Sequence, residues 1–293
     1  MNDSSGHNTY YTNPESAPEM VRLRKQDQLL TKYMGGLFPD SIDLSQIHDI
    51  LDLACGPGGW VFDVAYTHPK KHVVGVDVSQ TLIEYARAEA KVQWLGNVIF
   101  EVMNVLQPLD FPDGSFDLVN ARTIAGFMLT DTWPTLLQES MRILRPGGVL
   151  RLTETDRWGQ TNSVAFEQLS SLCMMALFLS GHSFDKSGRT FGITPMLEHL
   201  LAQAGFQQIE TSQYDIDFSA GTAAHESMYE NLRVFFQLAQ PFLLATRSTY
   251  PHAGIPDKQE LDHLYEQVIL DMLSDNFSAT FSLLSAWGKK PRE

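Results

Sequence analysis

The sequence predicts an α/β protein built on a doubly wound, seven-stranded, mostly parallel sheet. Hydrophobic runs of strand length alternate with amphipathic runs of helix length along the chain. The sharpest example begins with the apolar run 50–53, which enters a glycine-rich turn; an amphipathic stretch follows, and a second apolar run, 73–78, contains Asp77. A strand, a tight turn, a helix and a second strand in this order form one βαβ unit of a parallel sheet.

The remaining elements follow from the same periodicities. The strands are expected at about 48–53, 72–77, 97–102, 116–121, 149–155, 206–218 and 279–287. The helices are expected at about 18–37, 58–67, 79–95, 132–144, 162–180 and 194–205. Ser79 is placed to cap one of them, because a serine hydroxyl can accept a hydrogen bond from the first turn. Residues 1 to about 18 are polar and without period, and we expect them to be mobile in isolation.

About sixty residues separate the last two expected strands. They hold two amphipathic stretches, 228–243 and 261–272, with Pro251 and Pro256 breaking the chain between them. This helix pair could cover exposed sheet and make a homodimer contact, or it could cap an acceptor pocket. We favour the cap, since ligands of open α/β sheets bind at the carboxyl ends of the strands; the two roles are compatible.

Composition limits the class of protein. The net charge is −14 and the pI near 5.0, which argues against a nucleic-acid partner because such binding needs a basic surface. No secretory signal is visible, and the longest apolar stretch, 172–179, is too short to cross a bilayer. Two cysteines make no disulfide framework, and no His, Cys and Asp set has metal-ligand spacing. We therefore expect a cytoplasmic protein with no membrane, nucleic-acid or metal partner.

The glycine turn predicts a nucleotide-like ligand. Gly56, Gly58 and Gly59 let backbone approach a ligand closely, because no Cβ stands in the way. Asp77, about 20 positions further on, is placed to accept hydrogen bonds from ribose hydroxyls. The two features together indicate a cofactor that contains adenosine.

Spacing narrows the choice of cofactor. A dinucleotide fingerprint would need glycine at 61, where Val61 stands, and no Gly-Lys-Ser/Thr follows the turn as a P-loop requires. Asp52, four residues before Gly56, would repel a pyrophosphate but suits the cationic amino or sulfonium group of S-adenosylmethionine. With this turn the sequence resembles the class I S-adenosylmethionine-dependent methyltransferases, whose fold is Rossmann-like. The match is to the branch of ubiquinone/menaquinone-biosynthesis-like and secondary-metabolite enzymes.

Two further segments support the resemblance. The stretch 111–119, Phe-Pro-Asp-Gly-Ser-Phe-Asp-Leu-Val, looks like the family's entry into its fourth strand, and 144–150, Leu-Arg-Pro-Gly-Gly-Val-Leu, like the turn into its fifth. Together the motifs cover roughly residues 48–156 in the family's order. The resemblance implies this organisation: an N-terminal lid and helix at 1–37, a cofactor-binding core at 38–160, further core with an extra helix at 161–221, a cap insertion at 222–276 and the last strand at 277–293.

The resemblance also implies roles for individual residues. Backbone at Ala54, Gly56 and Gly58 would lie along the methionine and ribose portions, and Asp77 would accept from both ribose hydroxyls. Adenine would lie between Val78 and Leu82, with its amino group bonded by Asn104 near Val105. The end of strand four, with Asn120 and Arg122, would pass the methionine portion, although Arg122 could equally be a structural ion-pairing residue. Tyr11 would close over the site as part of a lid, and Gln26 would reach the cofactor's carboxylate.

Methyl transfer to oxygen also needs a base within reach of the acceptor's proton. Glu154 and Asp156, at the end of strand five, and His182, in a loop after the 162–180 helix, are the predicted catalytic residues; the two carboxylates could instead bind a polar acceptor group. The expected function is methylation of a small, partly apolar metabolite, most often at oxygen, with nitrogen and carbon as alternatives. The rivals are a macromolecule methyltransferase and a cofactor-binding protein of this fold that cyclises, rearranges or only binds its ligand.

Overall fold

The structure, a computed structural model, describes residues 15–292. Tyr11, the predicted lid residue, lies outside this range. The strands are β1 Asp49–Leu53, β2 His72–Asp77, β3 Val98–Val102, β4 Phe116–Arg122, β5 Leu144–Glu154, β6 Gln160–Thr161, β7 Gln207–Asp217 and β8 Ala279–Lys289. The helices are α1 Ala17–Tyr33, α2 Gly59–Thr67, α3 Gln80–Val92, α4 Trp133–Ile143, α5 Val164–Leu179, α6 Leu197–Gln203, α7 His225–Thr249 and α8 Lys258–Met272, with short 3-10 turns η1 Leu44–Gln46 and η2 Thr194–Met196.

The sheet confirms the predicted fold class. Its order is β3-β2-β1-β4-β5-β8-β6, with β7 pairing β8 at the edge. The first five strands in this order run parallel, whereas β8 is antiparallel to β5, β6 and β7. The order reverses at β1, between β2 and β4, which is the topological position where such sheets bind ligands.

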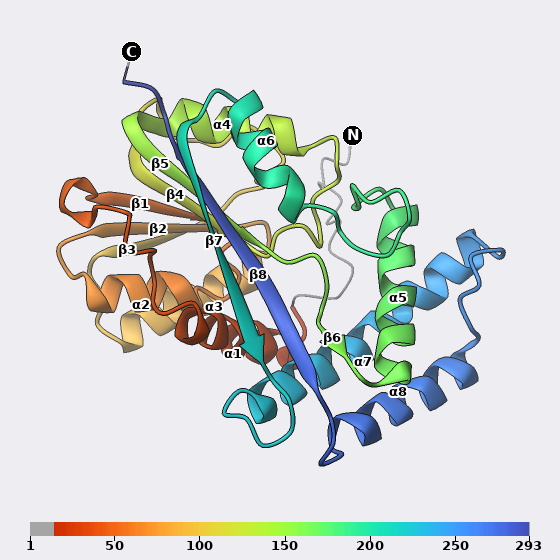
Figure 1. The fold of residues 1–293 in the computed structure, drawn as a ribbon. Coiled ribbons are helices and arrows are strands. Elements are labelled where there is room, and N and C mark those ends of the chain that lie inside the picture. Colours follow the sequence, from red (N-terminus) through yellow and green to blue (C-terminus); the bar gives the residue numbers. More distant parts are fainter. Residues whose placement is uncertain (1–14, 293) are drawn as a thin grey trace, which may run out of the picture.

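Side chains alternate along each strand and so divide the core between the two faces of the sheet. On β1, Leu51 and Leu53 join the larger cluster with α4 and α6, whereas Ile50 joins the cluster beneath α2 and α3. Figure 1 shows α2 and α3 on one face and α4 and α6 on the other. Hydrophobic burial on both faces explains why these strands read as nearly continuous apolar runs.

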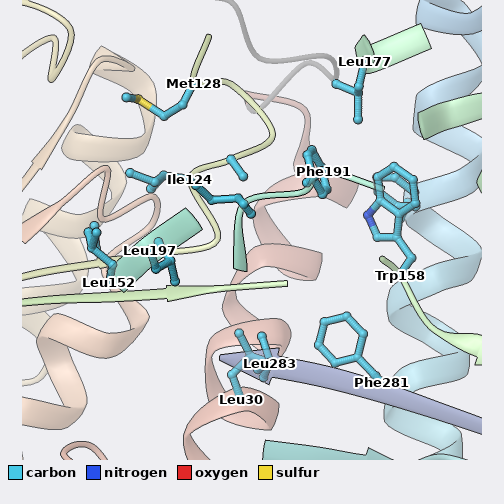
Figure 2. Packing of buried hydrophobic residues seen from close by; sticks show 14 of the residues in the cluster. Leu30, Ile124, Met128, Leu152, Trp158, Leu177, Phe191, Leu197, Phe281 and Leu283 are labelled. Carbon is cyan, nitrogen blue, oxygen red and sulfur yellow. The ribbon is translucent and has the colours of Figure 1, made fainter. Parts of the chain in front are cut away.

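A third group of helices lies beside the sheet. Figure 1 shows α5, α7 and α8 together, away from the α2 and α3 layer. The large core cluster continues into them without a break: Figure 2 shows Leu30 of α1, Phe281 and Leu283 of β8, and Trp158 among its members. The stretch predicted as an insertion therefore shares the main hydrophobic core through α7 and α8.

Local chemistry explains several helix ends. Ser79 caps α3 as predicted, its hydroxyl accepting from the Leu82 amide. Asp257 and Glu260 form a capping box at the start of α8. The helix α1 ends at Tyr33, four residues before the predicted end at 37, because Gly35 and Gly36, which follow it, both have positive φ.

The strands differ from the sequence prediction mainly in two respects. It contains an eighth strand, β6, whose Gln160 and Thr161 pair with β8; two residues are too short for any periodic signal. In addition, β5 begins at Leu144 rather than near 149, because Leu144 pairs with Phe116 across a register shift.

The turn between β1 and α2 is sterically restricted. Ala54, Gly56 and Gly58 all have positive φ, a region that costs L side chains about 1–2 kcal/mol. A Cβ added at Gly58 would lie 2.8 Å from the Phe100 ring of β3. Gly58 is thus required by both backbone conformation and packing.

We predict that Gly58→Ala lowers the free energy of unfolding by about 2–4 kcal/mol, from left-handed strain together with overpacking against Phe100. Urea denaturation would measure the change. Gly96→Ala is the matched control, since a Cβ there meets nothing within 4 Å and no positive φ is involved, so its stability should change little. Equal losses in both variants would contradict this steric explanation.

Candidate functional site

One pocket lies across the carboxyl ends of β1 to β5 and is covered by α1 and α7. Ten of the predicted site residues line it, contributed by α1, by the strand ends and by α3. They are Gln26, Ala54, Gly56, Asp77, Val78, Leu82, Asn104, Val105, Arg122 and Glu154. Residues that the sequence singled out therefore come together around one pocket, and hydrogen bonds fix several of their side chains there.

Asp77 is held rigidly at the end of β2. Its carboxylate oxygens accept from the backbone amides of Gly56 and Ser79, both at 2.9 Å. Burial raises the pKa of Asp77, and the surrounding backbone N–H groups oppose that rise. Each oxygen has further lone pairs, so the side chain can accept additional hydrogen bonds from a ligand.

The backbone at Gly56 leaves open space above it. A Cβ placed there would meet only Leu23 Cδ1, at 4.0 Å. Gly58, by contrast, does not line the pocket and packs against Phe100. Gly56 thus leaves room for a ligand, whereas Gly58 fixes the conformation of the turn.

The residues predicted to surround adenine lie together at the β2 and β3 end of the pocket. Leu82 is buried, and Val78 is 41% exposed although it is large and apolar. The Asn104 side-chain oxygen accepts from the Leu106 amide at 2.9 Å, which fixes the loop after β3. One lone pair of that oxygen remains for a ligand.

Asp52 and Asn120 lie beneath the pocket, outside its lining. Asn120 Nδ2 donates to Asp52 Oδ1 at 2.7 Å, and both residues are buried. Burial raises the pKa of Asp52 to about 7, against the opposing effect of the Arg122 charge. Because Asp52 does not line the pocket, it would act on a ligand there through its electrostatic field and not by direct contact.

Arg122 is a structural ion-pairing residue that also lines the pocket. Its guanidinium donates to Asp27 of α1 at 2.6 Å and to Thr31 at 3.2 Å, and it lies 5.8 Å from the Trp60 ring centroid. The sequence left two readings open for Arg122, and this geometry is compatible with both. The ion pair attaches α1 to the end of β4.

Gln26 belongs to a polar network that the sequence did not predict. Its Oε1 accepts from Arg22, and its Nε2 donates to Thr123 Oγ1 at 3.5 Å. Arg22 also forms a buried two-point pair with Glu19, at 2.6 and 2.8 Å, and donates to Asn231 of α7 at 2.9 Å. The sequence did contain a signal for part of this network, because a Glu and an Arg three residues apart on the apolar face of a helix indicate a buried ion pair.

Glu154 ends β5 at the far side of the pocket. It is 1% exposed and accepts from the backbone amides of Ile124 and Ala125, at 2.8 and 3.3 Å. Burial raises its pKa to about 8, more than those two amides lower it. Three strand spacings separate β2 from β5, so Glu154 lies about 14 Å across the sheet from Asp77.

The other two predicted catalytic residues lie outside the pocket lining. Asp156 accepts from the amides of Ile193 and Thr194 and from the Thr194 hydroxyl, and its backbone oxygen accepts from the Phe191 amide. It therefore fixes the loop that carries Phe191. His182 is buried in the turn after α5, where its backbone amide donates to Leu177.

Aromatic side chains line the end of the pocket near Glu154. Trp158 lies 4.6 Å from Phe235 of α7 and 5.8 Å from Phe191, measured between ring centroids, and Phe281 of β8 and Phe127 also line this end. Sequence reasoning missed all of these residues except Phe235, which it placed on the cap. Trp158 could have been found, since it follows the carboxyl end of a strand; Phe191 had no local signal.

Comparisons with known proteins identify the family of this chain. Residues 50–148 match a family model described as a methyltransferase domain. The demethylmenaquinone methyltransferase of Lactococcus lactis is 33% identical over 175 residues, which cover 56% of this chain and 68% of that protein. The chain belongs to the class I S-adenosylmethionine-dependent methyltransferases.

One further relative and one solved structure are also similar to this chain. Nocamycin O-methyltransferase of Saccharothrix syringae is 27% identical over 221 residues, covering 69% of this methyltransferase and 75% of that protein. The crystal structure of the YcgJ protein of Bacillus subtilis shares the fold, with a TM-score of 0.52 at 14% identity, over 84% of this chain and 93% of that one.

The methyltransferase has residues that fit its cofactor, S-adenosylmethionine. Open space above Gly56 and a rigid carboxylate at Asp77 suit the ribose, and Val78 and Leu82 suit an apolar ring. Among the described residues no helix is long and apolar enough to span a membrane. Within residues 15–292, no group of three His, Cys, Asp or Glu side chains is arranged to hold a metal ion.

We predict that Glu154 makes the methyltransferase less stable as pH rises. Its pKa in the folded protein is raised to about 8, so the native state holds a proton that the unfolded chain has already released. The associated stability is complete below about pH 4.5 and is lost as pH rises toward 8. Urea denaturation should show the wild type losing up to about 1.4 kcal/mol per pH unit relative to Glu154→Gln in this window.

Exposed Glu84 provides the control for that comparison. Glu84→Gln should keep a constant difference from the wild type across the same pH range. The contribution of Asp52, which has the same sign, is common to all three proteins and cancels. Parallel pH curves for the wild type and Glu154→Gln would disprove the assignment.

Proposed function

We propose that this methyltransferase transfers a methyl group to an oxygen of a small, partly apolar molecule. One observation carries the proposal: the pocket ends, beyond the strand that carries Arg122, in an aromatic and aliphatic compartment with the Glu154 carboxyl at its base. An acceptor there would lose apolar surface to Trp158, Phe191 and Phe235, at about 25 cal/mol per Å² buried.

The named relatives support a small acceptor. One is named for demethylmenaquinone and one for O-methylation of nocamycin. The net charge of −14 also disfavours RNA, which needs a basic surface. The aromatic compartment is closed by side chains of α7 and of the Trp158 and Phe191 loops, so it would admit a small molecule more readily than a folded protein.

Different residues of the chain would bind the cofactor and remove the proton of the acceptor. S-adenosylmethionine supplies a methyl carbon that its positive sulfur activates. Asp77 and the Gly56 backbone would hold the adenosine end, and Gln26 and Arg122, which line the same pocket, would border the methionine end. Glu154 would take the proton of an acceptor hydroxyl as the new oxygen–carbon bond forms and the carbon–sulfur bond breaks, which leaves S-adenosylhomocysteine as the neutral second product. Alignment and exclusion of water by α1 and α7 would supply much of the remaining rate enhancement.

The function is tested by product analysis. The protein is incubated with S-adenosylmethionine and a panel of phenols, naphthols and hydroxyquinones, and S-adenosylhomocysteine and methylated product are measured together. We expect equal amounts of both, with a rate that rises as pH approaches 8, where Glu154 ionises. Turnover of an acceptor without S-adenosylhomocysteine would favour cyclisation or rearrangement, and methylation confined to RNA or protein would contradict the small acceptor.

We predict that Asp77→Ala weakens S-adenosylhomocysteine binding about 100-fold, because two charge-assisted hydrogen bonds of about 1.5 kcal/mol each are lost. Isothermal titration calorimetry measures the affinity directly. Asp275→Ala, in an exposed turn far along the chain, should bind as the wild type does. Near-normal affinity of Asp77→Ala would disprove the ribose assignment.

A further inference from the structure

The polar network at the seam between α1 and α7 links the two halves of the pocket. It begins at Thr123, on the loop after β4, and passes through Gln26 and Arg22 of α1 to Asn231 of α7. Thr123 and the three side chains that follow it all line the pocket. The network thus runs from the cofactor half to the helix that covers the acceptor half.

Arg22 is suited to transmit position because its guanidinium is fixed. Glu19 binds it through two parallel hydrogen bonds, and a planar guanidinium held in this way has little rotational freedom. Both Glu19 and Arg22 are buried, at 0% and 6% exposure, so solvent does not weaken the pair. The Phe235 ring of α7 lies 5.8 Å from the guanidinium carbon and adds a second contact across the seam.

Asn231 is the point where α7 receives this contact. Its side-chain oxygen accepts from Arg22, and the neighbouring residues of the same helix face, Met228, Leu232 and Phe235, line the acceptor compartment. If the hydrogen bond between Arg22 and Asn231 breaks and Asn231 moves, the apolar side chains on the same face of α7, which an acceptor would contact, move with it. A buried hydrogen bond to a charged group is worth about tenfold in an equilibrium constant.

We propose that Arg22 and Asn231 form a latch through which an occupied cofactor site positions α7 over the acceptor compartment. The proposal rests on the proposed function, because it assumes that a ligand reaches Gln26 from the cofactor half. Arg22 and Asn231 are positioning residues in this scheme. A cofactor that fixes Gln26 would hold α1 and its already rigid Arg22 guanidinium in one position, so that Asn231 and α7 are ordered against it and bind an acceptor at a lower entropic cost.

Hydrogen exchange with S-adenosylhomocysteine as the only ligand tests the latch without knowledge of the acceptor. Calorimetry first establishes saturating ligand, and deuterium uptake is then followed in peptides from α1, α7 and α8. In the wild type, ligand should slow exchange in α1 and α7 and leave α8 unchanged. In Asn231→Ala, slowing in α1 should persist, while slowing in α7 should fall by about tenfold.

Two variants make the test specific. Asn231→Asp keeps an oxygen that accepts from Arg22 and should retain slowing in α7. Gln237→Ala removes an exposed amide from the same helix outside the pocket and should behave as the wild type does. A general loosening of α7 would instead raise its exchange without ligand as well, in proportion to any loss of melting temperature.

The outcomes separate the latch from the proposed function. If the wild type fails to bind S-adenosylhomocysteine, the cofactor assignment fails and the latch with it. If it binds but exchange in α7 does not change, or changes equally in Asn231→Ala, the latch alone is overturned. Slowing that is lost in Asn231→Ala and retained in Asn231→Asp would establish it.

Discussion

The ion pair between Asp27 of α1 and Arg122 of β4 is the contact on which the site depends. It holds α1 across the start of α2, where a Cβ on Gly59 would come within 2.6 Å of the Asp27 carboxylate. Removing one partner of such a pair costs about 3–5 kcal/mol, because the other charge stays buried. Without α1 in this place, Gln26 and Arg22 would have no defined position, and the pocket would lose its cover.

The same face of the sheet carries an unusual row of buried polar groups. Asp52, Asn120 and Arg151 are register neighbours on β1, β4 and β5. Arg151 donates to the Leu37 carbonyl, and burial lowers its pKa to about 9. Within the described residues, Asn120 Oδ1 and Arg151 Nε find no hydrogen-bond partner, a costly arrangement for stability alone. This row places polar and charged groups beneath the strand ends that carry the pocket, whereas Trp158, Phe191 and Phe235 line it with apolar surface.

Sequence reasoning succeeded where the determinants are local. The glycine turn, the strands and Asp77 follow from periodicity and spacing, and ten of the predicted site residues accordingly line one pocket. It failed where residues far apart in the sequence meet: Asn231 contacts Arg22 across 209 positions, and Phe191 reaches the pocket only because Asp156 fixes its loop. Asp156 was predicted from its place at a strand end and His182 from its place in the loop after a helix; both lie outside the pocket lining, and Asp156 bonds the loop that carries Phe191.

The place of β8 has a consequence for synthesis of the chain. β8 is the last strand to be made, yet it pairs with β5 on one side and with β7 on the other. A ribosome adds about 5–20 residues per second, so more than a hundred residues, and several seconds, separate the completion of β5 from its partner. Throughout that interval the β5 edge that later pairs with β8 has no partner from β8, and an unpaired edge of this kind is a template for pairing with another newly made chain.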